Sequence, residues 1–226
     1  MKHALRSLQL LALFAGAAFI GACASSPPVP DWESNAKTAM DHAIAAYLAG
    51  DTRLADSDLE RARTEIARTG RIDLLGRAEL VHCAARVASL VFEPCERFEK
   101  LRADSAAPER AYADYLAARV QPQDIALLPP QHRAVAATNL SAENAAAALR
   151  GIEDPLSRLV AIGVLFQAGR AHPTAITRAA DTASAQGWRR PLLAWLSVQL
   201  ALADKAGDAS EAARLRRRLG VVQGDK

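Results

Sequence analysis

Cys23 is the side chain in this sequence best suited to covalent chemistry. A thiolate is a much stronger nucleophile than a hydroxyl, so a cysteine is the residue that would react readily with a lipid donor. Gly21 and Ala22 precede it and are small, as a cleavage point lying extended in a peptidase groove requires. Ile20 adds a bulky apolar side chain just upstream. The pattern is typical of a processing point beside a reactive thiol.

The residues before this point have the layout of a signal peptide. Lys2, His3 and Arg6 form a basic start, and residues 10–20 are apolar. This apolar stretch is shorter than the roughly 20 residues that span a bilayer. Together with residues 20–23 it resembles the signal peptide and lipobox of bacterial lipoproteins. An ordinary secretory signal with an incidental cysteine is the alternative.

The resemblance implies that residues 1–22 are removed and that Cys23 becomes the acylated N-terminus, which is a tether to a lipid bilayer. Ala24, in place of an aspartate, implies the outer membrane with the protein facing the periplasm. Residues 23–30 then form the acylated N-terminus and a Ser/Pro-rich linker. At about 3.1 Å per residue in a polyproline conformation, this linker would reach about 20 Å from the membrane. Apart from the lipid, no cofactor is expected.

Cys83 and Cys95 are the remaining cysteines. In an oxidising compartment such a pair is typical of a disulfide. If a helix continues to Val91, however, Cys83 lies about 12 Å before its end, and Cys95 must return to within about 7 Å between Cα atoms. Two buried, reduced cysteines are the alternative. A zinc site with His82 lacks a fourth ligand at a recognised spacing, so no metal is predicted.

Catalytic motifs are absent from the sequence, which predicts a protein that is not an enzyme. Glu33 and Ser34 resemble the Glu-Ser pair of lytic transglycosylases, but the downstream Gly-Leu-Met-Gln segment of that family is missing. An acid in the first turn of a helix is also expected for structural reasons. The four histidines after residue 23 have no evident partners in the sequence, and they are His42, His82, His132 and His172.

The charge of the chain is close to balanced. Of 28 basic side chains two lie in residues 1–22, which leaves 26 against 25 acidic ones. This balance does not favour a nucleic-acid partner. Two basic clusters stand out: residues 188–190, with a tryptophan, and the last predicted helix. The latter could contact anionic lipid or an acidic partner, or simply face the C-terminal end of the helix dipole. It contains Arg214, Arg216, Arg217 and Arg218.

Residues 31–226 are predicted to be helical nearly throughout. Alanine is abundant, and apolar residues recur at helical spacing. Residues 71–92 are apolar on almost all sides, which predicts a central, buried helix. A shorter helix is expected over residues 95–103. The next contains Tyr112 and Tyr115, which we interpret as half-buried with solvated hydroxyls, or as the lining of a groove. Residues 121–130 contain three prolines and mark a possible sub-boundary.

The first predicted helix pair resembles a tetratricopeptide repeat. A glycine forms its turn, and small or apolar residues stand at the helix crossing. These positions are Ala43, Gly50, Ala55, Leu59 and Ala62. The match is partial, because Ala39 and Ala67 replace the tryptophan and proline of the family. The last pair repeats the Gly-Asp turn at Gly207, with Ala212 in the place of Ala55. The resemblance implies an all-α, tetratricopeptide-like solenoid of antiparallel helix pairs.

These features predict an outer-membrane lipoprotein whose helical domain is a scaffold for a protein or peptide partner in the periplasm. The functional part of this prediction rests on analogy at the level of the fold, since solenoids offer concave binding surfaces. A cell-wall enzyme with an unrecognised helical fold and a purely structural helical bundle are the alternatives.

Overall fold

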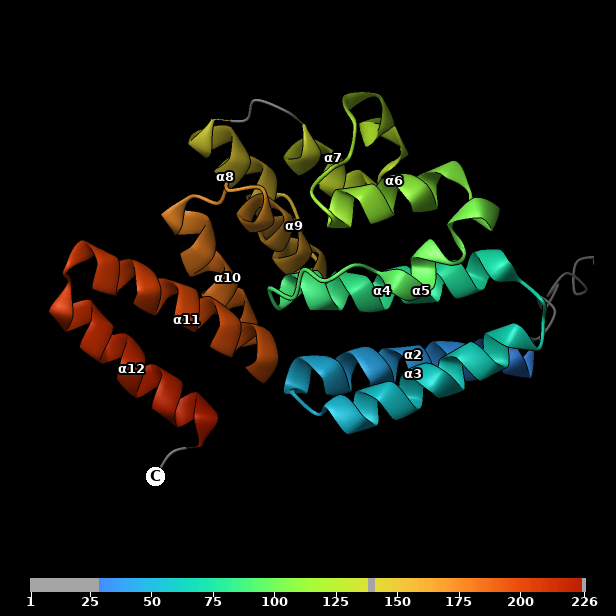
Figure 1. Ribbon diagram of the computed structural model, residues 1–226. Helices are drawn as coiled ribbons and strands as arrows, with labels where there is room; N and C mark the ends of the chain where they lie inside the picture. The colour runs from blue at the N-terminus through green and yellow to red at the C-terminus, as the bar shows by residue number, and fades with distance from the viewer. Residues whose placement is uncertain (1–28, 138–140, 225–226) are drawn as a thin grey trace, which may run out of the picture. The chain divides into compact units, whose positions relative to one another are not determined.

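The computed structural model describes residues 29–137 and 141–224, and within these residues all regular structure is helical. Contacts divide the chain into two units, residues 1–31 and 32–226. The second unit contains all the helices described, apart from Asp31, the first residue of α2. Its helices, shown in Figure 1, are α2 (Asp31–Ala49), α3 (Thr52–Ala67), α4 (Ile72–Ala88), α5 (Glu96–Glu99), η1 (Arg102–Asp104), α6 (Ala107–Leu116), η2 (Pro122–Leu127), α7 (Pro130–Ala136), α8 (Ala142–Arg150), α9 (Pro155–Gln167), α10 (Pro173–Ala185), α11 (Arg189–Ala206) and α12 (Ala209–Gln223).

The first hairpin, α2 and α3, turns where the Gly-Asp pair predicts. Gly50 has φ of 98°, a conformation that glycine adopts without steric penalty. Asp51 then caps α3, because its carboxylate accepts a hydrogen bond from the Leu54 amide at 2.9 Å. The positions that match the tetratricopeptide pattern are buried on both helices. Their exposed fractions are 1% for Ala43, 3% for Ala55, 2% for Leu59 and 0% for Ala62.

The central position of α4 agrees with the sequence, but its predicted extent was wrong. It packs against α3, α6 and α9. The helix ends at Ala88 because Leu90 turns into the left-handed region, with φ of 61°. The Trp195 indole, from α11, donates a hydrogen bond to the Ala88 carbonyl at 3.0 Å and so satisfies a group at this helix end. One flank of α4 is also open, since Val81 is 41% exposed.

The contact between α4 and α9 depends on Gly163. A Cβ added at Gly163 would lie 2.5 Å from the Val87 carbonyl oxygen and 3.0 Å from its Cγ1. The backbones therefore approach more closely than any residue larger than glycine allows. Beside this contact, Leu159 and Ile162 are fully buried in the main core.

The segment after α4 is more broken than predicted. The helix expected over residues 95–103 is divided into α5 and η1, separated by Lys100 and Leu101. Residues 121–130 contain η2, which contacts both α6 and α7. One continuous core cluster contains buried side chains from before and after this segment, such as Phe98 and Leu196.

From α9 onward each helix packs against the next in the chain. Asp154 caps α9 through the Ser157 amide at 2.6 Å, as its position before Pro155 predicts. The turn before α12 repeats that of the first hairpin, with φ of 72° at Gly207 and a hydrogen bond of 2.9 Å from the Glu211 amide to Asp208. The last helix continues to Gln223, beyond the predicted end at residue 220. No helix in the described residues is long and apolar enough to cross a membrane.

Candidate functional site

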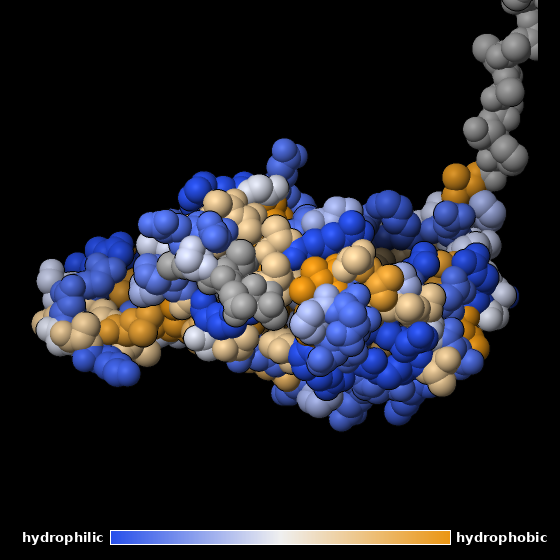
Figure 2. Space-filling view, turned by 90° about the horizontal axis from the view of Figure 1, so that it is seen from above, coloured by the Kyte–Doolittle hydropathy of each residue, from blue (hydrophilic) through white to orange (hydrophobic). Residues whose placement is uncertain are grey.

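An open apolar groove lies between α4, α6 and the turn from η2 to α7. Its volume is about 440 Å³. Val81, on α4, and Leu127, on η2, both line it and are 41% and 38% exposed, so apolar surface from two separate elements is open to solvent at one place. Figure 2 shows apolar surface among charged residues on the face formed by α6, η2 and α7. The other lining residues are Arg77, Leu80, Pro108, Glu109, Tyr112, Leu128, Pro129, Pro130 and Arg133.

Prolines give the groove its shape. Pro108 lies in the first turn of α6, where a missing amide hydrogen costs nothing. Pro129 and Pro130 end η2 and begin α7, and Leu128 between these helices is fully buried. Because proline fixes its own backbone angle, the wall that contains Leu127 is stiff. The groove is thus largely formed before any ligand arrives.

An ion pair crosses the edge of the groove. Arg77, on α4, donates from Nε to Oε1 of Glu109 on α6 at 2.7 Å. The Glu109 side chain is only 9% exposed, whereas that of Arg77 is 58% exposed. The second carboxylate oxygen, Oε2, is buried without a hydrogen-bond partner among the described residues. Arg133, on α7, also lines the groove and donates from Nε to the Leu128 carbonyl at 2.7 Å. Both guanidinium groups of the groove are therefore engaged with the protein.

Beneath the groove lies an aromatic cluster formed by Tyr112, Tyr115 and His132. The tyrosine rings are stacked with centroids 6.0 Å apart, and the His132 ring lies 5.0 Å from that of Tyr115. The Tyr115 hydroxyl is 3.3 Å from His132 Nδ1. The interpretation of both tyrosines as half-buried with solvated hydroxyls was therefore wrong for Tyr115, which is fully buried. Tyr112 lines the groove, as the alternative interpretation states.

Burial governs the protonation of this cluster. It lowers the pKa of His132 to about 4, against a smaller opposing effect of Asp154, so the imidazole is neutral at pH 7. Burial also raises the pKa of Tyr112 and Tyr115. The cluster is thus uncharged and supports the groove as an apolar floor. No partner for His132 is evident from the sequence, because Tyr115 is on a different helix.

Cys83 and Cys95 are joined by a disulfide in this structure, with Cα atoms 6.0 Å apart. The early end of α4 makes this possible, since the chain turns back at Leu90 rather than continuing as helix to Val91. Neither sulfur is then a metal ligand. No group of histidine, cysteine or acidic side chains in the described residues is arranged to hold a metal ion.

Near the disulfide, α3 and α4 share a buried ion pair. Arg63 binds both carboxylate oxygens of Glu79, from Nε at 2.5 Å and Nη2 at 2.6 Å. Their side chains are 11% and 5% exposed. A third group, Glu60, accepts a hydrogen bond from the Arg63 Nη1 at 2.7 Å. Bidentate geometry of this kind fixes the register of two helices. We interpret it as structural.

The arginines of the last helix do not act as one cluster. Arg214 pairs with Glu211 at 2.6 Å, and Arg216 pairs with Asp204 at 2.8 Å. Arg217 is exposed and forms no ion pair within the described part of the chain, and Arg218 is half-buried. The interpretation through the helix dipole was wrong, because α12 continues to Gln223 and has no basic residue in its last turn.

The basic segment at residues 188–190 instead binds the ends of two helices. Arg190 donates from Nε to the Tyr47 carbonyl, at the end of α2, at 2.6 Å, and its guanidinium lies 4.3 Å from the Tyr47 ring. Arg189 donates to the carbonyls of Val222 and Gln223, at the end of α12, at 3.1 Å. Arg189 thus satisfies carbonyl groups that a helix end leaves unpaired, whereas the Tyr47 carbonyl accepts the Arg190 bond in addition to one from the Gly50 amide.

Of the other predicted sites, Glu33 is exposed and so lacks the buried setting that a catalytic acid of the transglycosylase type needs. Ala22 and Cys23 lie outside the described residues. His42 is exposed, and the His82 ring packs edge-on against Tyr47.

Comparison with protein-family models, with curated proteins and with solved structures finds no match for this chain. The site is therefore interpreted from its own geometry. Nothing in the sequence alone marks Val81, Leu127 or Pro129 as residues of a binding site. The available signal was a Leu-Leu-Pro-Pro run inside a segment otherwise assigned as a break.

Proposed function

We propose that this protein is a lipid-anchored scaffold of the bacterial outer membrane that binds a short segment of a partner protein on its periplasmic side. The binding site is the groove between α4, α6 and η2. The lipobox-like residues 20–23 support the anchor, and the proline-rich linker supports a domain held away from the bilayer.

The observation that carries this proposal is the exposure of Val81 and Leu127, from α4 and η2, in one groove. Covering apolar surface contributes about 25 cal/mol for each Å² removed from water. The two guanidinium groups that line the groove are already engaged, Arg77 with Glu109 and Arg133 with the Leu128 carbonyl, so binding depends on the apolar walls. The occupant is therefore a peptide segment with apolar side chains.

A tetratricopeptide-like solenoid is the finer description of the fold that we favour. The first and last hairpins share a left-handed glycine, an aspartate cap and a buried alanine, Ala55 in one and Ala212 in the other. Repeated turn chemistry of this kind supports repeated helix pairs. Solenoids commonly bind extended peptides.

Site-specific photo-crosslinking in intact cells tests the function. A photoreactive phenylalanine at Leu127 is expected to capture a partner, whereas the same residue at Leu202 on α11, which is 42% exposed, is the matched control. Val81→Glu, introduced with the Leu127 probe, is expected to abolish the adduct because it places a carboxylate in the apolar wall. Equal adducts from both probe positions, or an adduct that survives Val81→Glu, would contradict the proposal.

A further inference from the structure

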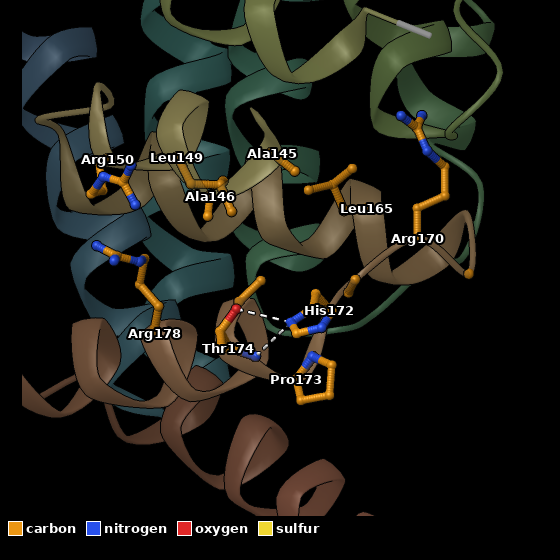
Figure 3. Close-up of a pocket in the computed structure, with 13 residues that line it drawn as sticks. Ala145, Ala146, Leu149, Arg150, Leu165, Arg170, His172, Pro173, Thr174 and Arg178 are labelled. Carbon is orange, nitrogen blue, oxygen red and sulfur yellow. Dashed lines mark hydrogen bonds between the residues drawn. The ribbon is translucent and has the colours of Figure 1, made fainter. Parts of the chain in front are cut away.

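A second cavity, separate from the groove, lies where α8 and α9 end and α10 begins. Its volume is about 630 Å³, within the range of about 300–1,000 Å³ that is usual for small-molecule sites. Figure 3 shows side chains from all three helices, and from the connection before α10, turned toward one space. The cavity is therefore large enough for more than a single ion.

The charge of this cavity is of one sign. Three arginines and one histidine line it, and no aspartate or glutamate does. The groove on α4 and the cavities around the disulfide differ, since each includes at least one glutamate. The basic residues are Arg150, Arg170, His172 and Arg178. An uncompensated cavity of this kind attracts anions.

Arg150 and Arg178 are the two charged groups of the cavity that would hold an anion. Figure 3 shows their guanidinium groups, from α8 and α10, directed toward each other. Neither forms an ion pair with a carboxylate in the described part of the chain, although most of its other arginines bind a carboxylate or a backbone carbonyl. Two facing cations repel, and an oxyanion between them would accept hydrogen bonds from both.

The remaining walls determine what the rest of the ligand is like. Ala145 and Ala146 of α8, which are half-buried, supply apolar surface beside Arg150, whereas Leu149, Leu165 and Ala175 close the wall behind them and are only 1%, 3% and 7% exposed (Figure 3). At the far end His172 Nδ1 lies 3.1 Å from the Thr174 hydroxyl, and Arg170 donates to the Ala137 carbonyl at 3.4 Å. These polar groups are already engaged with the protein. The free basic groups and the apolar wall therefore lie together, which suits an anionic head attached to an apolar body.

We propose that the cavity between α8, α9 and α10 binds a small amphiphilic oxyanion, with a phosphate or carboxylate head held between Arg150 and Arg178 and an aliphatic body against Ala145 and Ala146. The chemistry is common to a phospholipid headgroup with its first acyl carbons and to a free organic phosphate. It does not depend on the function proposed for the groove.

Isothermal titration of the full chain, held in phosphatidylcholine nanodiscs, tests the proposal. The probes are hexyl phosphate, dihexanoyl phosphatidylglycerol and hexanol. The variants are Arg150→Gln with Arg178→Gln, the corresponding double lysine variant, and Arg53→Gln with Arg217→Gln as a control on exposed arginines of α3 and α12. Each probe partitions into the nanodisc lipid equally for every variant, so this contribution cancels when the variants are compared. Thermal unfolding of each variant verifies that it is folded.

Hexyl phosphate is expected to bind saturably, and the double glutamine variant to weaken binding by about ten-fold or more, since two charge-assisted hydrogen-bonding groups are lost. The lysine variant should be intermediate and the control unchanged. Tighter binding of dihexanoyl phosphatidylglycerol with the same loss assigns a lipid headgroup, and tighter binding of hexyl phosphate assigns a free organic phosphate. No saturable binding of either anion, equal binding of hexanol, or equal binding by the glutamine variant would overturn the proposal.

Discussion

The substitution Gly163→Ala tests the packing of α4 on α9 most directly. The new Cβ would lie 2.5 Å from the Val87 carbonyl oxygen, a distance that real Cβ atoms essentially never adopt. The clash is with backbone, so no change of rotamer relieves it and the two helices must separate. Overpacking in a core costs about 1–3 kcal/mol, and an obstruction by backbone belongs at the upper end.

An opposing effect reduces this cost. Alanine is favoured over glycine within a helix by about 1 kcal/mol. The difference leaves a loss of about 2 kcal/mol in the free energy of unfolding, which corresponds to a fall in Tm of about 4–8 °C for a chain of this size. Gly151→Ala is the matched control, because its Cβ would meet nothing closer than 3.5 Å.

Urea denaturation followed by circular dichroism measures both variants. We expect Gly163→Ala to lower the midpoint and Gly151→Ala to leave it unchanged or raise it slightly. If Gly163→Ala were as stable as the native protein, α4 and α9 would not be in the contact described, and the interpretation of this core would have to be abandoned.

Three further predictions follow from the cysteines and from His132. The bond between Cys83 and Cys95 closes a short loop, so its reduction should lower stability by about 3 kcal/mol; peptide mapping under non-reducing conditions should find the two peptides linked, and two free thiols would contradict the bond. Burial lowers the pKa of His132 to about 4, below its unfolded value of about 6.5. The contribution of His132 to the free energy of unfolding is therefore fully present above pH 6.5, and the free energy of unfolding falls by about 3 kcal/mol at most as the pH drops toward 4. His132→Gln should flatten this part of the pH profile in urea titrations, and a profile identical to the native one would show that His132 is not the responsible group. Globomycin should cause an unprocessed precursor to accumulate in cells, and Cys23→Ser should block acylation; a native chain that is processed normally in the presence of globomycin would refute the anchor.

Local signals predicted much of the fold. Residues that can cap a helix through their own side chains mark helix starts in the sequence, and the structure has such caps at Ser141, Asp154 and Asp208. The buried faces of the first hairpin were also predicted, because small residues at helical spacing indicate a crossing. Such signals act within a few residues, which is why the sequence alone contains them.

Features that depend on contacts between distant residues were not predictable. The end of α4 is fixed in part by Trp195, which lies 107 residues later and donates to the Ala88 carbonyl. Both candidate sites are also of this kind. Val81 and Leu127 line one groove only after the chain has folded through α6, and Arg150 is directed toward Arg178 only once α10 has returned beside α8 (Figure 3). The spacing of these residues in the sequence does not indicate that either pair comes together in the fold.

Arg189 and Arg190, at the start of α11, affect how the protein unfolds. In a linear array of repeats, a terminal pair can fray without disturbing the opposite end. Here Arg190 binds the last turn of α2 and Arg189 binds the last turn of α12, so the earliest and latest helices are fastened to one spot. Only the Arg190 contact joins the two outer hairpins, because Arg189 and its partners lie within the last one. Melting of the last hairpin would release Arg190 from α2, so we expect faster hydrogen exchange at the end of α2 whenever the last hairpin opens.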